Sequence, residues 1–213
     1  MKRLIGTVLG VALVLSASAQ AVPTIVNKVD TVDSNVVYMG QLVTTLNTDA
    51  SDDAQLYLEK ASYQLTAPLT LTSGGTLPAG TWVSSYILSF DLNSAPPNNR
   101  ATADITFDTT VLGLIYDTTT ANPNLKATDG TLGLGTSYYD SFERKLELSD
   151  GAVPGSADTV SFSGNTVSVS LYGKVNPDDV RIVTAPIPVP GAMLLAGLGT
   201  ALVGWIRNRR RLS

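Results

Sequence analysis

The chain has 213 residues, of which 14 are Lys or Arg and 18 are Asp or Glu, and it contains no Cys and no His. A chain of this length is expected to form one domain, or two at most. Without cysteine it has no disulfide framework and no thiolate metal site, and without histidine it has no Ser-His-Asp triad and no His-ligated zinc site. Carboxylates are therefore the plausible catalytic groups that remain.

The charges are unevenly distributed along the chain. Six of the 14 basic residues lie in the two terminal segments, whereas all 18 acidic residues lie between Asp30 and Asp179. The part between the ends therefore has 8 basic and 18 acidic residues and a net charge of −10. This balance argues against a nucleic-acid partner, which would need a basic surface, and it is compatible with a secreted body that attracts cations.

The first 21 residues contain the three parts of a secretory signal peptide. Lys2 and Arg3 form a positive n-region, residues 4–15 form an apolar h-region, and small residues follow. Ala19 and Ala21 fit the cleavage site, with a cut after Ala21 preferred and a cut after Ala19 as the near alternative. The apolar run is short for a membrane span, and no basic stop follows it. We therefore expect this segment to be removed on export.

Residues 22–185 form the body of the chain, where runs of alternating apolar and polar residues predict β-strands. The clearest run covers residues 82–92 and predicts a strand with one buried face. One helix is possible over residues 52–62, although residues 55–65 also alternate as in a strand. Further strands are expected over residues 103–107, 111–116 and 180–184.

A β-hairpin is predicted over residues 159–171. Val160 and Phe162 alternate with small polar residues, and aliphatic alternation resumes after the dipeptide Gly164-Asn165. Gly at the first turn position favours a type II′ turn. Turn clusters such as Asn122-Pro123-Asn124 recur at intervals typical of two-sheet proteins. The body is therefore predicted to be an all-β ectodomain, either a β-sandwich or a jelly roll.

Three glutamates, Glu59, Glu143 and Glu147, are the candidates for carboxylate chemistry. A glycoside hydrolase would need two acids that face one sugar. Glu143 and Glu147 would share a face only on a helix, whereas the leucines beside Glu147 favour a strand. We therefore expect these glutamates to be solvated surface acids, and we predict no catalytic residue.

Other acids have the oxygen ligands that calcium prefers, namely Asp49, Asp52 and Asp53, or the pair Asp178 and Asp179. Neither group has the spacing of the twelve-residue calcium loop with its Gly and closing Glu. Calcium binding therefore stays a hypothesis, and the sequence predicts no metal site and no cofactor.

Several tyrosines offer the aromatic faces with which a carbohydrate-binding module stacks on sugar rings. They are Tyr38, Tyr57, Tyr63, Tyr138 and Tyr139. Packing in the core or in turns is the interpretation that we prefer for them, and carbohydrate binding is the alternative.

The segment 186–213 begins with alternating prolines and continues as an apolar run. Proline fixes φ and has no N–H, so the start of the segment should be extended. No residue from Ala192 to Ile206 is charged. The 18 residues from Val189 to Ile206 would form a helix about 27 Å long, close to a hydrocarbon core of roughly 30 Å. We therefore predict a transmembrane helix over residues 190–206.

A basic cluster follows the apolar run and consists of Arg207, Arg209, Arg210 and Arg211. Arginines on that side would hold the C-terminus in the cytoplasm by the positive-inside rule. The body would then lie outside the cytoplasm, as the N-terminal signal also predicts.

A proline motif, an apolar helix and an arginine cluster in this order resemble the PEP-CTERM sorting signal of Gram-negative bacteria. The motif maps to Pro188, Val189 and Pro190, followed by Gly191 and Ala192. The family's namesake has Glu where this chain has Val189, so the segment is similar to the Val-Pro-x-Pro-Gly-Ala variant. The resemblance covers about the last 28 residues. It implies that an intramembrane exosortase-type enzyme recognises the motif and cleaves the tail.

Both ends therefore predict an exported protein that uses the secretion machinery and its C-terminal helix to reach the inner membrane transiently. It would then become a non-enzymatic component of the cell surface or extracellular matrix. Association with exopolysaccharide or biofilm is implied by the resemblance alone. The alternatives are a carbohydrate-binding module and a glycoside hydrolase that uses two carboxylates.

Overall fold

The computed structural model describes residues 22–28, 34–42, 53–91, 99–118, 123–134, 144–149, 155–173 and 177–186. The expected signal peptide, with Ala19 and Ala21, lies outside the described residues. So do the sorting motif, the predicted transmembrane helix and the arginine cluster. No helix within the described ranges is long and apolar enough to cross a membrane.

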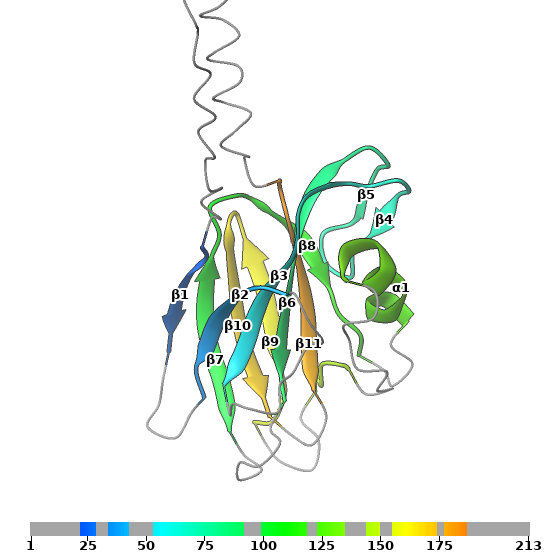
Figure 1. The fold of residues 1–213 in the computed structure, drawn as a ribbon. Helices are drawn as coiled ribbons and strands as arrows, with labels where there is room; N and C mark the ends of the chain where they lie inside the picture. Colours follow the sequence, from blue (N-terminus) through cyan, green and yellow to red (C-terminus); the bar gives the residue numbers. More distant parts are fainter. Residues whose placement is uncertain are drawn as a thin grey trace, which may run out of the picture. The chain divides into compact units, whose positions relative to one another are not determined.

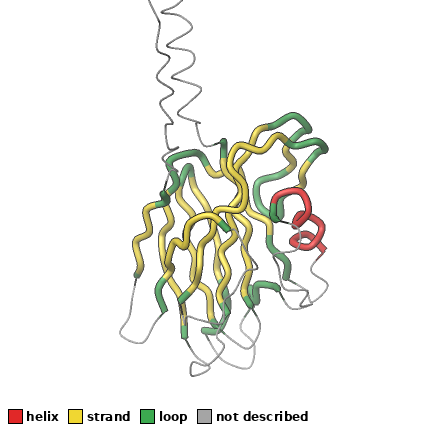
Figure 2. The backbone as a smooth tube through the Cα atoms, in the orientation of Figure 1, coloured by secondary structure: helices red, strands yellow, loops and turns green. Residues whose placement is uncertain are grey.

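The described part of the chain contains eleven strands and one helix, coloured yellow and red in Figure 2. In chain order these are β1 (Thr24–Asn27), β2 (Val36–Gln41), β3 (Ala54–Gln64), β4 (Leu69–Thr70), β5 (Thr76–Leu77), β6 (Trp82–Phe90), β7 (Arg100–Thr106), β8 (Val111–Ile115), α1 (Pro123–Leu132), β9 (Thr159–Ser163), β10 (Thr166–Tyr172) and β11 (Asp178–Thr184). The prediction of a β-rich body is therefore confirmed, with one short helix that the sequence did not predict.

Two main sheets pack together (Figure 1). The four-stranded sheet has the order β1-β7-β10-β9, and the five-stranded sheet has the order β2-β3-β6-β11-β8. All pairs are antiparallel except β2 with β3, which is parallel. The short strands β4 and β5 form a separate hairpin.

The main core lies between the two sheets and follows from the period-two alternation of the strands. On β7, Ala101, Ala103 and Ile105 are fully buried, while the residues between them are partly exposed. Strand β10 repeats this pattern, with buried aliphatic residues that meet those of the five-stranded sheet in one cluster. Because successive side chains point to opposite faces, the other face of the four-stranded sheet is left polar.

The five-stranded sheet is covered on both faces, which corrects the prediction of a half-buried strand at residues 82–92. On β6, Tyr86 and Leu88 belong to the main core, whereas Val83 and Ile87 belong to a second core. This second core also contains Leu125 and other side chains of α1 and the β4–β5 region. The helix therefore supplies a third layer that the alternation alone could not reveal.

Helix α1 begins where the sequence suggested only a turn. Its first residue is Pro123, and proline suits the first helical position because the N–H that it lacks would have no partner within the helix. The next two N–H groups donate to one carboxylate, with Asn124 N 3.2 Å from Asp117 Oδ1 and Leu125 N 3.0 Å from Asp117 Oδ2. Asp117 therefore satisfies donors that helix geometry leaves free.

The predicted hairpin is confirmed as β9 and β10, joined at Gly164-Asn165. Gly164 has a φ of +61° and Asn165 does not have a positive φ, as the predicted type II′ turn requires. The expected strands over residues 103–107, 111–116 and 180–184 correspond to β7, β8 and β11. The alternative helix over residues 52–62 is wrong, because β3 occupies that region.

We expect residues 22–187 to fold without the two terminal segments, because the eleven described strands and both cores lie within this compact unit. Produced alone, they should give a β-rich far-ultraviolet circular dichroism spectrum and one cooperative unfolding transition in urea. A chain that stops at Asp179 should not fold, because it lacks most of β11, which pairs with both β6 and β8. Equal stability of the two chains would contradict this prediction.

Candidate functional site

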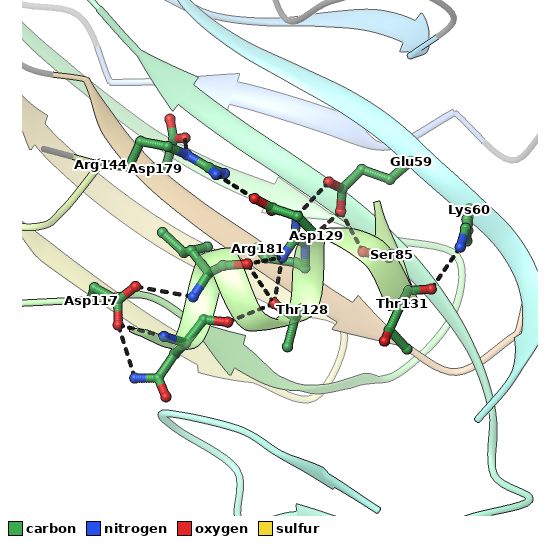
Figure 3. Close-up of polar contacts among 12 residues, drawn as sticks. Glu59, Lys60, Ser85, Asp117, Thr128, Asp129, Thr131, Arg144, Asp179 and Arg181 are labelled. Atoms are coloured by element: carbon green, nitrogen blue, oxygen red, sulfur yellow. Dashed lines mark hydrogen bonds and ion pairs between the residues drawn. The ribbon is translucent and has the colours of Figure 1, made fainter. Parts of the chain in front are cut away.

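Five charged side chains meet between the five-stranded sheet and α1, and we call them the ion-pair cluster (Figure 3). They are Glu59 on β3, Asp179 and Arg181 on β11, Asp129 on α1, and Arg144 in the segment 144–149. Each has at most 9% of its surface exposed. Charges so deeply buried are costly unless they are paired, so their contacts decide what this region does.

The cluster arises from the alternation of the two strands beneath the helix. On β11, Val180 and Ile182 point into the main core, so Asp179 and Arg181 point toward the layer that contains α1. Glu59 reaches the same face from β3. The sheet therefore presents charges of both signs to the helix.

Arg181 is the centre of the cluster. Its guanidinium binds Glu59 through two parallel contacts, Nε to Oε2 at 2.8 Å and Nη2 to Oε1 at 2.9 Å. The same Nη2 donates to Asp129 Oδ1 at 2.8 Å, and Nη1 donates to the Leu125 carbonyl at 3.1 Å and to the Thr128 hydroxyl. The planar five-donor fork of arginine suits this set of acceptors, which lysine could not match.

A second arginine extends the cluster to the segment 144–149. Arg144 Nη1 lies 2.9 Å from Asp129 Oδ2, and its Nε donates to Asp179. Burial by itself would lower the pKa of Arg144, but the carboxylates of Asp179 and Asp129 outweigh it and hold that pKa above its usual value. The five residues thus combine two positive and three negative charges, with Asp129 bridging both guanidinium groups.

The segment that carries Arg144 is itself fixed by Asp158. The Glu147 N–H donates to Asp158 Oδ2 and the Tyr172 N–H donates to Asp158 Oδ1, both at 2.7 Å. Burial raises the pKa of Asp158, although these two backbone donors act in the opposite direction. This carboxylate joins the segment 144–149 to β10, and so couples the position of Arg144 to the four-stranded sheet.

The geometry does not place Glu59 for acid or base catalysis. Both of its oxygens accept bonds from Arg181, Ser85 Oγ donates to Oε2 at 2.5 Å, and its side chain is 0% exposed. A glycoside hydrolase needs two carboxyl groups that face the sugar and a water. Glu147 lies elsewhere, with Lys145 Nζ 3.8 Å from its Oε1. The expectation of a solvated surface acid is therefore wrong for Glu59, while Glu143 lies outside the described residues.

The aspartates that were candidates for calcium binding, where the structure describes them, either point to different faces or already bind other groups of the protein. Asp53 Oδ1 accepts the Asn35 N–H at 2.8 Å, and Asp179 binds Arg144. Asp178 precedes Asp179 on β11 and therefore points to the opposite face. No group of three or more His, Cys, Asp or Glu that could hold a metal occurs in the described ranges, and Asp49 and Asp52 lie outside them.

The described tyrosines pack against the cores, as preferred from the sequence. Tyr38 lies against the main core, whereas Tyr57 and Tyr63 lie against the second core. Lys60 Nζ is 4.6 Å from the centre of the Tyr63 ring, so a cation already occupies that aromatic face. Tyr138 and Tyr139 lie outside the described residues.

Sequence reasoning missed Arg181, Arg144 and Asp129. The signal that could have found Arg181 is the order Asp-Asp-Val-Arg-Ile-Val at residues 178–183, in which charges alternate with aliphatic residues in a strand. The partners from β3 and α1 are remote in sequence and carry no such signal. Comparison with models of protein families, with curated proteins and with solved structures finds no match to this chain.

We expect Arg181→Met in residues 22–187 to reduce the free energy of unfolding by about 3–5 kcal/mol, because it leaves the Glu59 carboxylate buried without its cation. Glu59→Gln should lower the free energy of unfolding less in the Arg181→Met chain than in the native chain, because it no longer leaves a buried arginine without its carboxylate partner. Urea denaturation of the double-mutant cycle measures both effects. Lys28→Met, which removes an exposed pair with Asp104, is the matched control and should change little. Strictly additive effects of Glu59→Gln and Arg181→Met would contradict the coupling.

Asp158 should make a pH-dependent contribution to stability. Because burial raises its pKa in the folded protein, this contribution is complete below the unfolded pKa of about 3.9 and is lost as pH rises through the folded pKa. The difference in unfolding free energy between the native chain and Asp158→Asn should therefore fall from about pH 3 to about pH 7. Urea denaturation across this range tests the sign.

Asp104→Asn is the matched control for this titration. Hydrogen bonds from Lys28 and Ser168 lower the pKa of Asp104, so its contribution is present at neutral pH and is lost as pH falls through the folded pKa. The difference in unfolding free energy between the native chain and Asp104→Asn should therefore rise with pH. If the differences for the two aspartates changed in the same direction with pH, the opposite pKa shifts assigned to Asp158 and Asp104 would be contradicted.

Proposed function

We propose that this chain is an exported, non-enzymatic protein of the cell surface or extracellular matrix whose C-terminal segment is removed by an exosortase-type enzyme. The observation that carries the proposal is the position of the folded body between the two expected processing sites. Strand β1 begins at Thr24, just after the expected cleavage following Ala21, and β11 ends at Thr184, just before the motif at residues 188–192. Both cuts would therefore fall outside the strands.

The contacts at the end of β11 support this reading. The Ala185 N–H donates to the Thr110 carbonyl at 2.8 Å, and the Thr109 hydroxyl donates to the Ala185 carbonyl at 3.0 Å. These bonds hold the end of the body to the loop before β8. Cleavage beyond Pro186 would leave them and the β11 pairings intact, so a β-sandwich ectodomain could be released without unfolding.

The chemistry of the body is consistent with a structural role. The ion-pair cluster takes up two of the 8 basic and three of the 18 acidic residues between the ends, so the residues outside it still have a net charge of −9 and give an acidic surface. Such a surface disfavours nucleic acid as a partner. Glu59 forms a buried ion pair with Arg181, and this favours a role in stabilising the fold over a role in catalysis. The partners that we propose are the secretion machinery, the processing enzyme, the inner membrane during transit, and exopolysaccharide or biofilm matrix afterwards.

Intact mass of the protein from its own host, together with membrane and extracellular fractionation, tests the proposal. We expect a mass that begins at Val22, ends between Pro188 and Ala192, and occurs in the surface or extracellular fraction. A mass that retains residues 207–213 in the membrane fraction would indicate an ordinary single-pass anchor and would overturn the sorting proposal.

A proline variant separates motif recognition from general loss of export. Pro188→Ala with Pro190→Ala should accumulate the unprocessed chain in the membrane, because the motif is altered while the apolar run and the arginines are retained. Pro186→Ala is the matched control, since this proline lies outside the motif. Equal processing of both variants would argue against recognition of the motif.

A further inference from the structure

A pocket of about 280 Å³ lies between α1 and the chain segment that runs from the end of β3 to β4. Four of its lining residues, at positions 124, 127, 128 and 131, recur at helical spacing and form one face of α1. The complete lining consists of Leu65, Thr66, Ala67, Pro68, Leu69, Thr70, Asn124, Ala127, Thr128 and Thr131. Figure 1 shows β4 and α1 as neighbours on the side of the five-stranded sheet away from the four-stranded one.

Several polar groups of the lining are available to a ligand. The hydroxyls of Thr66, Thr70 and Thr131 have no hydrogen-bond partner within the part of the chain that the structure describes. Asn124 donates through Nδ2 to Asp117 Oδ1 at 2.9 Å, which leaves its amide oxygen as an acceptor. These groups offer three donors and at least four acceptors to one small volume.

The rest of the lining is aliphatic, and its composition restricts the ligand further. No charged side chain lines the pocket, so neither an anion nor a cation would find a countercharge. No aromatic ring lines it either, so a ligand here would be held by hydrogen bonds and aliphatic contacts and not by ring stacking. A volume just below the roughly 300–1,000 Å³ of sites for drug-sized ligands fits one small ring. Hydroxyl groups beside aliphatic carbons match a sugar ring, which has hydroxyl edges and C–H faces.

The walls of the pocket are held in place by interactions beneath it. Thr128, at the base, is 9% exposed, and its hydroxyl accepts from Arg181 and donates to the Asn124 carbonyl at 2.8 Å. Lys60 donates to the Thr131 carbonyl at 2.7 Å and so fixes the last turn of the helix (Figure 3). The helix wall is therefore anchored to the sheet before any ligand arrives, which lowers the entropic cost of binding.

The other wall is anchored through a close approach of two backbone segments. The Thr72 N–H donates to the Leu114 carbonyl at 2.8 Å, and the Leu114 N–H donates to the Ser73 carbonyl at 2.8 Å. A Cβ at Gly113 would lie 2.4 Å from the Ser73 oxygen, so only glycine allows this approach. The segment that follows β4 is thereby fixed to the edge strand β8.

We propose that this pocket binds one uncharged sugar residue of a polysaccharide. The ligand chemistry follows from the lining, whereas its source, the matrix around the exported body, rests on the proposed function. The net charge of −10 between the ends disfavours acidic sugars in the same pocket. The pocket is distinct from the tyrosines considered above, because none of them lines it.

Calorimetric titration of the full chain, purified in a detergent without a sugar headgroup, tests the proposal. The probes are glucose, galactose, mannose and N-acetylglucosamine, with glucuronate as the charged counterpart and neutral oligosaccharides from the host polysaccharide as the polymer. We expect saturable binding of at least one neutral sugar, no binding of glucuronate, and binding of the oligosaccharide that is at least as tight as that of its monomer. Absence of saturation with every neutral sugar would overturn the proposal.

Variants locate the binding on the chain. Ala127→Trp should abolish it, because an indole at this exposed helix position fills the pocket. Thr66→Val with Thr131→Val should weaken it at least about tenfold, since two hydrogen bonds are lost while shape is retained. Thr24→Val with Thr159→Val is the matched control on exposed threonines of the four-stranded sheet and should leave binding unchanged. Thermal unfolding verifies that each variant is folded.

The outcomes separate this inference from the proposed function. Binding that survives Ala127→Trp would overturn the pocket as the site, whatever the sugar. Binding of free monosaccharides without the oligosaccharide would overturn the polysaccharide as the source. Pocket-dependent binding by a chain that its host retains in the membrane would support the pocket and refute the sorting, because intact mass and calorimetry report on different parts of the chain.

Discussion

The contact of Arg181 with Glu59 and Asp129 is the interaction on which the layered arrangement depends. Arg181 lies 122 residues from Glu59 and 52 from Asp129, and it joins β11 to both β3 and α1. Desolvation of such charges is expensive, and the cost is offset only when every partner is in place. The cluster therefore favours one position of the helix on the sheet, where aliphatic contacts alone would tolerate several. Asp129 extends this constraint to Arg144 and the segment 144–149.

The two sheets differ because of what covers them. The four-stranded sheet has one buried face and shows simple alternation on β7 and β10. The five-stranded sheet has a core on each side, so β11 is buried at every position. A strand with two covered faces must place any polar residue against a partner, and Arg181 and Asp179 meet that requirement through the ion-pair cluster. The pocket beside α1 exists because the helix and the β4 region form this third layer together.

Different parts of the body hold the fold together and offer a surface to a ligand. Buried carboxylates are used to hold elements together, whereas the pocket is lined by neutral hydroxyl and aliphatic groups. The strands end close to both expected processing sites, so removal of the ends would leave these interactions intact. A body without disulfides can then rely on two cores and an internal salt-bridge network for its stability.

The sequence by itself determined the local elements whose signal is contained in a few adjacent residues. The alternation of apolar and polar residues at 103–107 predicted β7, and the Gly164-Asn165 turn predicted the β9–β10 hairpin. Both signals are local, because alternation and turn geometry depend on neighbouring residues alone. Only the tertiary structure decided that Glu59 is buried and paired, since its partner Arg181 is remote along the chain. The prediction of a solvated acid could not take that partner into account. Helix α1 was hidden because a proline that begins a helix and a proline in a turn look alike in sequence. The pocket likewise needed the fold, because its two walls come from segments more than fifty residues apart that meet only when the second core forms.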